Sequence, residues 1–251
     1  MDFQTLFRSQ CLITDGAMGT YYSEIYGKES GSPENDNLTD PQKIEDIHRE
    51  YIKAGADILR TNSFASNIHT LCAGNAGSMT REEQLQTVYE NVAAACRIAQ
   101  SAAEQELTCA KEEGKEIKEI CIAGDIGPVP EKRGAEEQDE ELVEEYKVMA
   151  KAHLDAGLKL IWFETFSDFE RILPVAEWIR SVSDAFIMAS FSVNVFGYTK
   201  TGLGMRELLK TAKESNLIDG IGFNCGIGPS HLGKLLKRQD LGNLIVAAVP
   251  N

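Results

Sequence analysis

Six polar or reactive residues in this 251-residue chain each stand at the end of a short apolar run. They are Asp15, Asn62, Asp125, Glu164, Asn194 and Cys225. A carboxylate can receive an ammonium group, an amide can donate and accept hydrogen bonds, and a thiolate can act as a nucleophile or a metal ligand. If the apolar runs are parallel strands, their carboxyl ends meet at one edge, so these residues would converge there.

The apolar runs alternate with segments of helical periodicity. The expected strands are residues 11–15, 57–61, 120–124, 158–163, 185–191, 218–223 and 244–249. Asp40-Pro41 and Gly55 predict the two ends of a helix, and Thr80 with Glu83 predicts a capping box at the start of another. Asp168 is expected to cap a third helix. Strands that alternate with helices predict parallel crossover connections.

This pattern predicts an α/β chain with a TIM (β/α)8-type barrel, forming one domain over residues 1–251. A closed barrel of this type has eight strands, and the seventh apolar run ends close to Asn251. We therefore expect a barrel truncated after strand seven, without its last strand. An open doubly wound sheet is the alternative fold, but the first run is not followed by the Gly-x-Gly-x-x-Gly loop that such folds often carry.

Composition excludes several classes of partner. The net charge is −14, from 25 basic and 39 acidic residues, so nucleic acid and anionic membranes are poor partners. No apolar stretch is long enough to span a bilayer, and the first residues do not resemble a signal peptide. The 6 cysteines lack the paired spacing of a secreted disulfide framework. We expect a cytoplasmic protein.

Four sites along the chain could bind a ligand. The glycines of Asp15-Gly-Ala-Met-Gly-Thr20 would let the backbone approach a carboxylate, although such a sequence is also an ordinary turn. Glu164 follows a very apolar run, so its carboxylate needs an ammonium partner or a structural ion pair. Asn62 could bind an amino-acid-like ligand or cap its own loop. Cys225 is placed for metal or substrate, or is an inert buried thiol.

Taken together, the motifs resemble the homocysteine S-methyltransferase family. The segments that carry the resemblance occur in the family's order: Asp15-Gly-Ala-Met-Gly-Thr20, Thr61-Asn-Ser-Phe64, Gly124-Asp-Ile-Gly-Pro128, Glu164-Thr165, Gly222-Phe-Asn-Cys-Gly226 and Pro250-Asn251. They extend over essentially the whole chain. The first segment is most similar to the homocysteine-binding module of cobalamin-dependent methionine synthase and of bacterial proteins that fuse this module to methylenetetrahydrofolate reductase.

The resemblance implies zinc-dependent methyl transfer to the thiol of homocysteine, giving methionine. In that family zinc is held by three cysteines, of which Cys225 matches one, and Asn251 is a further candidate ligand. The residues implied to bind homocysteine are Asp15, Gly16, Ala17, Met18, Gly19, Asn62 and Glu164. The implied methyl donor is methylcobalamin or methyltetrahydrofolate, free or on a donor-carrying domain.

The family's other two zinc ligands form a Cys-Cys pair, and this chain has no Cys-Cys. Catalytic zinc usually has three protein ligands. We therefore expect the isolated chain to bind zinc weakly or not at all, and to be weakly active or inactive. The alternatives are a non-catalytic substrate-binding or interaction module, and an unrelated barrel enzyme that uses Asp15 and Glu164 as acid and base.

Overall fold

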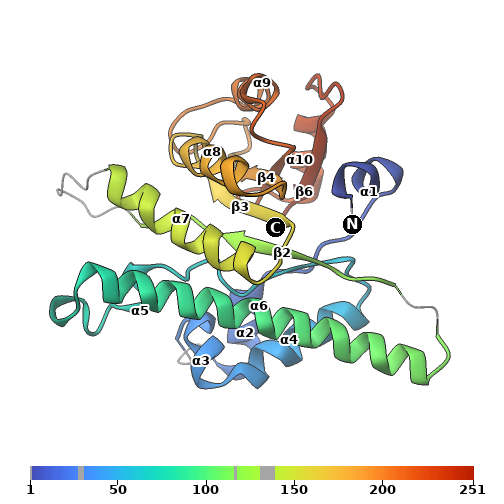
Figure 1. Cartoon of the computed structure of the whole chain (residues 1–251). Coiled ribbons are helices and arrows are strands. Elements are labelled where there is room, and N and C mark those ends of the chain that lie inside the picture. Colours follow the sequence, from blue (N-terminus) through green and yellow to red (C-terminus); the bar gives the residue numbers. More distant parts are fainter. Residues whose placement is uncertain (1, 28–30, 116–117, 131–138) are drawn as a thin grey trace. The chain divides into compact units, whose positions relative to one another are not determined.

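The computed structural model describes residues 2–27, 31–115, 118–130 and 139–251, and its paired strands are parallel (Figure 1). These residues fall into two compact units. The described parts of the C-terminal unit are residues 2–10, 139–147 and 159–251. Those of the N-terminal unit are residues 11–27, 31–115, 118–130 and 148–158.

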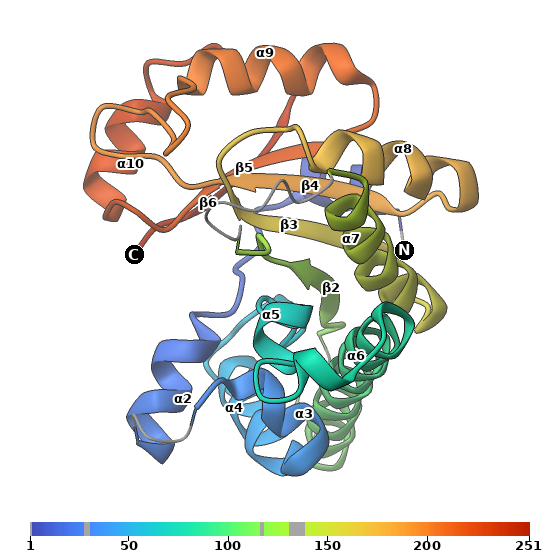
Figure 2. The ribbon, with the colours of Figure 1, turned by 90° about the vertical axis from the view of Figure 1, so that its left-hand side faces the viewer.

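The C-terminal unit contains a parallel sheet whose strands are neighbours in chain order. Its strands are β3 (Leu160–Phe166), β4 (Phe186–Phe191), β5 (Gly220–Asn224) and β6 (Ile245–Val249). Its helices are α1 (Phe3–Ser9), α8 (Ile172–Val182), α9 (Met205–Ser215) and α10 (Pro229–Leu236). Figure 2 shows α8 and α9 on one face of this sheet. Every residue of β4 and β5 is buried, as expected for parallel strands with both faces covered.

The N-terminal unit pairs β1 (Ile58–Arg60) in parallel with β2 (Cys121–Ile126). Its helical elements are α2 (Met18–Tyr26), η2 (Pro33–Asn35), α3 (Asp36–Thr39), α4 (Pro41–Lys53), α5 (Ile68–Leu71), η3 (Ala76–Ser78) and α6 (Arg81–Glu112). The 32-residue helix α6 packs against α3 and α4 (Figure 1). Helix α7 (Asp139–Asp155) contributes residues to both units.

The strongest local signals in the sequence are confirmed. Helix α4 has Pro41 in its first turn and is followed by Gly55, whose φ of 103° suits glycine. Helix α6 begins with the predicted capping box, in which the Thr80 hydroxyl accepts from the backbone N–H of Glu83 and the Glu83 carboxylate accepts from that of Thr80. Six of the seven predicted strands form, each within a few residues of its predicted bounds.

The first predicted strand, residues 11–15, is reduced to a single bridge between Thr14 and Ile58. The backbone N–H of Asp15 donates to the carbonyl of Ile58 at 2.8 Å, as a strand would. However, the N–H of Ile13 donates to the carboxylate of Asp57 at 2.7 Å. Because this side chain takes the place of a backbone partner, the ladder does not extend, and the prediction of a full strand here was wrong.

Two helix starts also differ from the predictions. Asp168 accepts from the N–H of Glu170 at 3.1 Å and so caps a turn, whereas α8 begins at Ile172 with Arg171 at its N-cap. The segment after Asp15 was compatible with an ordinary turn, but α2 begins inside it at Met18. This helix starts without a side-chain cap because Ala17 occupies the N-cap position.

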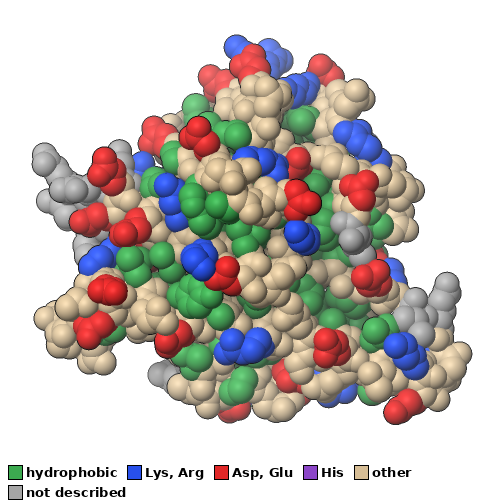
Figure 3. All heavy atoms as spheres, viewed as in Figure 1, with side chains coloured by type: hydrophobic (Ala, Val, Ile, Leu, Met, Phe, Trp, Pro, Cys, Tyr) green, Lys and Arg blue, Asp and Glu red, His purple; other side chains and the backbone are tan. Residues whose placement is uncertain are grey.

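No helix among the described residues is long and apolar enough to cross a membrane. On the face shown in Figure 3, acidic and basic side chains are interspersed rather than gathered by sign.

Candidate functional site

Cys225 lies directly after β5 in the C-terminal unit and is half-buried. Its backbone N–H donates to the carbonyl of Val249 at 3.1 Å, which holds it beside the end of β6. Its φ is 54°, in the left-handed region that few residues other than glycine adopt. The thiol therefore stands at the carboxyl end of a strand, as predicted, on a strained backbone.

The side chain of Asn224 connects Cys225 to the end of β3. Its Nδ2 lies 3.4 Å from Sγ of Cys225, 3.2 Å from Oε1 of Glu164 and 2.6 Å from Oγ1 of Thr165. Its Oδ1 accepts from the backbone N–H of Thr165 at 3.1 Å and from the hydroxyl of Ser190 at 2.8 Å. One buried amide thus contacts the candidate carboxylate and the candidate thiol.

Glu164 and Thr165 form the irregular end of β3. Glu164 is buried, and the pairing of β3 with β4 shifts between Phe163 and Phe166. Thr165 has a φ of 66°, which is a genuine outlier for a β-branched residue. Backbone conformations of this kind persist only where the surroundings hold them, and they cluster at functional sites.

Gly222 is required for this arrangement. A Cβ atom at position 222 would lie 2.5 Å from Oγ of Ser190, the hydroxyl that donates to Asn224. Gly222 therefore leaves room for the side chain of Ser190, its partner on the neighbouring strand β4.

Asn251, the second predicted metal ligand, follows β6, the strand that pairs with β5. Its backbone N–H donates to the carbonyl of Ile227 at 3.2 Å, and the residue is exposed. Cys225 and Asn251 therefore both follow the carboxyl ends of neighbouring strands. No group of three or more His, Cys, Asp or Glu side chains among the described residues is placed to hold a metal ion.

In the N-terminal unit, Asp15 forms a buried ion pair with Arg60. Oδ1 of Asp15 accepts from Nε of Arg60 at 2.8 Å, and Oδ2 accepts from the backbone N–H of Arg60 at 2.9 Å. The guanidinium also donates to the carbonyl of Gly16 at 3.0 Å. The pair positions the chain that leads into α2, a role that sequence reasoning missed because no local pattern marks Arg60.

The predicted carboxylate-binding segment contains the start of α2. Gly16, Ala17 and Gly19 are exposed, and Met18 is half-buried. The hydroxyl of Tyr51 donates to the carbonyl of Ala17 at 3.2 Å, and a Cβ at position 16 would lie 2.7 Å from that hydroxyl oxygen. The first N–H groups of a helix lack partners within the helix and favour anions. Binding of a substrate carboxylate by this segment stays a prediction.

Asn62 lies at the end of β1 in a network of buried amides. Its Nδ2 donates to the carbonyl of Pro33 at 3.0 Å and to Oδ1 of Asn37 at 2.8 Å. Asn37 in turn donates to the carbonyl of Asn62 and to Oδ1 of Asn91. These bonds tether the loop after β1 to η2 and α3, and Asn37 continues the network to Asn91 in α6. Binding of an amino-acid-like ligand by Asn62 stays a prediction.

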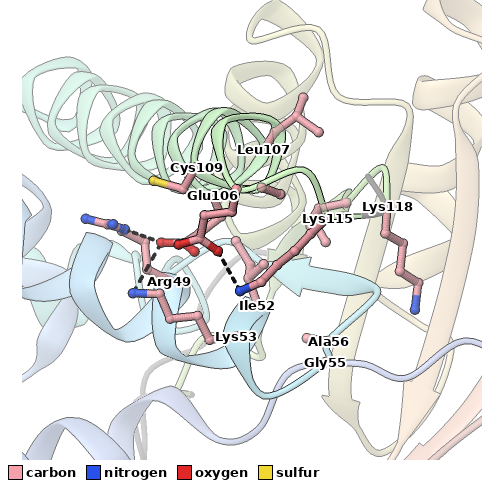
Figure 4. A pocket seen from close by; sticks show the side chains of 13 residues that line it. Arg49, Ile52, Lys53, Gly55, Ala56, Glu106, Leu107, Cys109, Lys115 and Lys118 are labelled. Carbon is pink, nitrogen blue, oxygen red and sulfur yellow. Dashed lines mark hydrogen bonds and ion pairs between the residues drawn. The ribbon is translucent and has the colours of Figure 1, made fainter.

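A cavity of about 510 Å³ lies near the amino-terminal ends of β1 and β2, where Gly55, Ala56 and Ile120 line it (Figure 4). Its cations are paired with carboxylates of the chain. Oε1 of Glu106 forms ion pairs with Nε of Arg49 at 2.6 Å and with Nζ of Lys53 at 3.4 Å. The other two pairs are Lys115 with Glu113 and Lys118 with Asp57. These pairs account for the charges of the cavity without a ligand, so we do not consider it the candidate site.

A family model for homocysteine S-methyltransferase matches residues 12–251. The chain belongs to this family. Two methionine synthases resemble this methyltransferase-family chain over its whole length, those of Mycobacterium tuberculosis at 25% identity and Mycobacterium leprae at 26%. The chain spans only 21% and 20% of the length of these relatives.

Solved structures show the same fold. The metallated form of the homocysteine methyltransferase MmuM from Escherichia coli matches with a TM-score of 0.76 and 20% identity, covering 98% of this methyltransferase-family chain and 86% of that one. The apo form of the same enzyme matches with a TM-score of 0.70 and 22% identity, covering 99% and 85%.

Proposed function

We propose that this chain is the part of a methyltransferase that binds homocysteine and presents its thiol to a methyl donor. The observation that carries the proposal is the contact of one buried amide, that of Asn224, with both Glu164 and Cys225. A carboxylate suits the ammonium group of an amino acid, and a cysteine thiolate can serve as a metal ligand. Membership of the family agrees with this pairing.

In the proposed reaction, the methyl carbon exchanges its bond to the donor for a bond to the homocysteine sulfur, and the thiol proton is lost. Glu164 would orient the substrate through its ammonium group. Asp15, Gly16, Ala17, Met18, Gly19 and Asn62 stay proposed substrate-binding residues on the strength of the family resemblance. Methylcobalamin and methyltetrahydrofolate, free or on a donor-carrying domain, stay the proposed donors, and residues 1–251 are proposed to act as one domain.

Zinc dependence is part of the proposal, but the described residues alone do not make a zinc site. A catalytic zinc ion usually has three protein ligands and one open position. Cys225 and Asn251 are the two candidates, and no cluster of three or more metal-binding side chains exists among the described residues. Zinc would supply deprotonation of the bound thiol. Because the ligand set is incomplete, we derive no step through the metal and propose weak activity or none for the isolated chain.

Calorimetric titration of the chain with L-homocysteine, L-cysteine and L-methionine tests the proposal. We expect homocysteine to bind most tightly. The variant E164Q should weaken homocysteine binding about tenfold or more, because it removes a charge-assisted hydrogen bond. D168N is the matched control, since Asp168 is a carboxylate of the same unit that accepts from Glu170. Equal affinity for the three amino acids would contradict the proposal.

A non-catalytic substrate-binding module is the second candidate function. It would use the same contacts of Asn224 with Glu164 and Cys225, but it would need no complete set of metal ligands. The two functions are separated by incubating the chain with homocysteine, zinc and methylcobalamin and measuring methionine by mass spectrometry. Tight binding of homocysteine without any methionine, even at saturating zinc, would favour the binding module.

A further inference from the structure

The geometry points to Asn224 as a positioning residue that holds the carboxylate of Glu164 and the thiol of Cys225 as one unit, so that an amino-acid thiol of the length of homocysteine fits between them. This inference rests on the proposed function, because it assumes that Glu164 receives the ammonium group of the substrate. It concerns the C-terminal unit alone.

The orientation of the Asn224 amide follows from its partners. The backbone N–H of Thr165 can only donate, and it lies 3.1 Å from Oδ1 of Asn224. The hydroxyl of Ser190 lies 2.8 Å from the same oxygen. Oδ1 must therefore be the acceptor on that side, which directs Nδ2 toward Glu164, Thr165 and Cys225. In a flipped amide, Nδ2–H of Asn224 would face the backbone N–H of Thr165, and the bond to this N–H would be lost.

Nδ2 has two hydrogens for three acceptors. The bond to Oγ1 of Thr165 is the shortest at 2.6 Å, while Glu164 and Cys225 lie at 3.2 and 3.4 Å. At least one hydrogen is therefore shared between acceptors, an arrangement that occurs in proteins. Because the carboxylate and the sulfur share one donor group, movement of either acceptor changes the bond to the other.

Backbone strain supports a positioning role. Thr165 and Cys225 both have positive φ, at 66° and 54°. Thr165 directly follows Glu164, and Cys225 directly follows Asn224. Asn224 holds Thr165 by two bonds, one to its N–H and one to its hydroxyl. Strain of this kind persists where neighbouring bonds over-determine the conformation. Asn224 is itself buried, so its bonds form where water does not compete well.

The spacing gives the inference a chemical consequence. Homocysteine has one methylene more than cysteine between its ammonium group and its sulfur. A carboxylate that is held at one distance from the thiol position can therefore distinguish the two amino acids. If Asn224 is lost, Glu164 gains freedom, and the preference for homocysteine over cysteine should fall.

The test is a double-mutant cycle on the dissociation constant for L-homocysteine. N224D preserves the size of the side chain and the acceptor for Thr165 and Ser190, but it loses both N–H donors. We expect N224D to weaken homocysteine binding about tenfold or more where Glu164 is present. In an E164A background, the same substitution should change the dissociation constant less than about twofold.

A purely structural role predicts a different result. Loss of folded protein would weaken binding by the same factor with and without Glu164, and this outcome would overturn the inference. S190A is the matched control, because it removes one donor to Oδ1 and leaves the Nδ2 bonds in place. Its homocysteine-to-cysteine preference should stay closer to that of the native chain than the preference of N224D does.

A spectroscopic measurement separates this inference from the proposed function. We expect the side-chain amide signals of Asn224 in a ¹H–¹⁵N spectrum to shift in both E164Q and C225S, without any ligand. If these signals shift but the native chain binds no homocysteine, the proposed function fails while the positioning role of Asn224 stands. If the signals respond to neither substitution, the positioning role of Asn224 is refuted.

Discussion

The carboxylate of Asp15 is bound by Arg60 on both oxygens, through the guanidinium Nε–H at 2.8 Å and the backbone N–H at 2.9 Å. Both side chains are buried. Removing one partner of a buried ion pair leaves an uncompensated charge, which typically costs about 3–5 kcal/mol. We therefore expect D15N and R60M each to lower the free energy of unfolding substantially, as measured by urea denaturation.

The double variant D15N/R60M is the informative comparison. It buries neither charge, so its loss of stability should be smaller than the sum of the two single losses. Strict additivity would mean that the two side chains do not interact as described. If Asp15 also binds substrate, D15N should weaken homocysteine binding more than R60M does at a temperature where both variants are folded.

His48 predicts a pH dependence of stability. It is fully buried in α4, where burial lowers its pKa from 6.5 to about 4, and neither ring nitrogen has a hydrogen-bond partner among the described residues. The unfolded chain therefore binds a proton near pH 6.5 that the folded chain does not bind until about pH 4. Its contribution to stability is complete above pH 6.5 and is lost as the pH falls toward 4.

The size of this effect is about 1.4 kcal/mol per pH unit within that window. H48L should remove this part of the slope, because leucine has no proton to bind. At pH 8 the variant should differ little from the native chain, and this measurement is the control. An unchanged slope between pH 6 and pH 4.5 in H48L would contradict the prediction.

Gly222 predicts a steric effect on the candidate site. In G222A the new Cβ would meet Oγ of Ser190 at 2.5 Å, so Ser190 must move and its bond to Asn224 should weaken. We expect lower thermal stability. G233A is the control, because Gly233 lies in α10 with open space around its Cβ position, and alanine is favoured in a helix. Equal effects of the two substitutions would argue against the steric account.

Zinc retention tests the incomplete ligand set. After dialysis against a mild chelator, the chain should hold well below one zinc ion per molecule, because the described residues offer fewer than the usual three ligands. The residual zinc should fall further in C225S and should not change in C11S, since Cys11 is an exposed thiol of the N-terminal unit. Stoichiometric zinc in the native chain would show that the ligand set is complete.

Part of the candidate site could be predicted because its signals are local. A polar residue at the end of an apolar run can be recognised without knowing what it contacts, and Glu164 and Cys225 were predicted in this way. Asn224 entered the prediction only as part of the motif Gly222-Phe-Asn-Cys-Gly226, and its adjacency to Cys225 was the one available signal. Its partners lie up to 60 residues away, so no local pattern reveals them.

The sequence by itself determined the two ends of α4, the start of α6, the order of the six strands and the family, because capping residues, prolines, apolar periodicity and motifs act between near neighbours in the chain. Only the tertiary structure decided which partner each polar side chain takes. Asp15 pairs with Arg60, Asn62 with Asn37, and Asn224 with Glu164 and Cys225. The physical reason is that a buried polar group must be satisfied by whichever donor or acceptor the packing brings near, however distant in sequence.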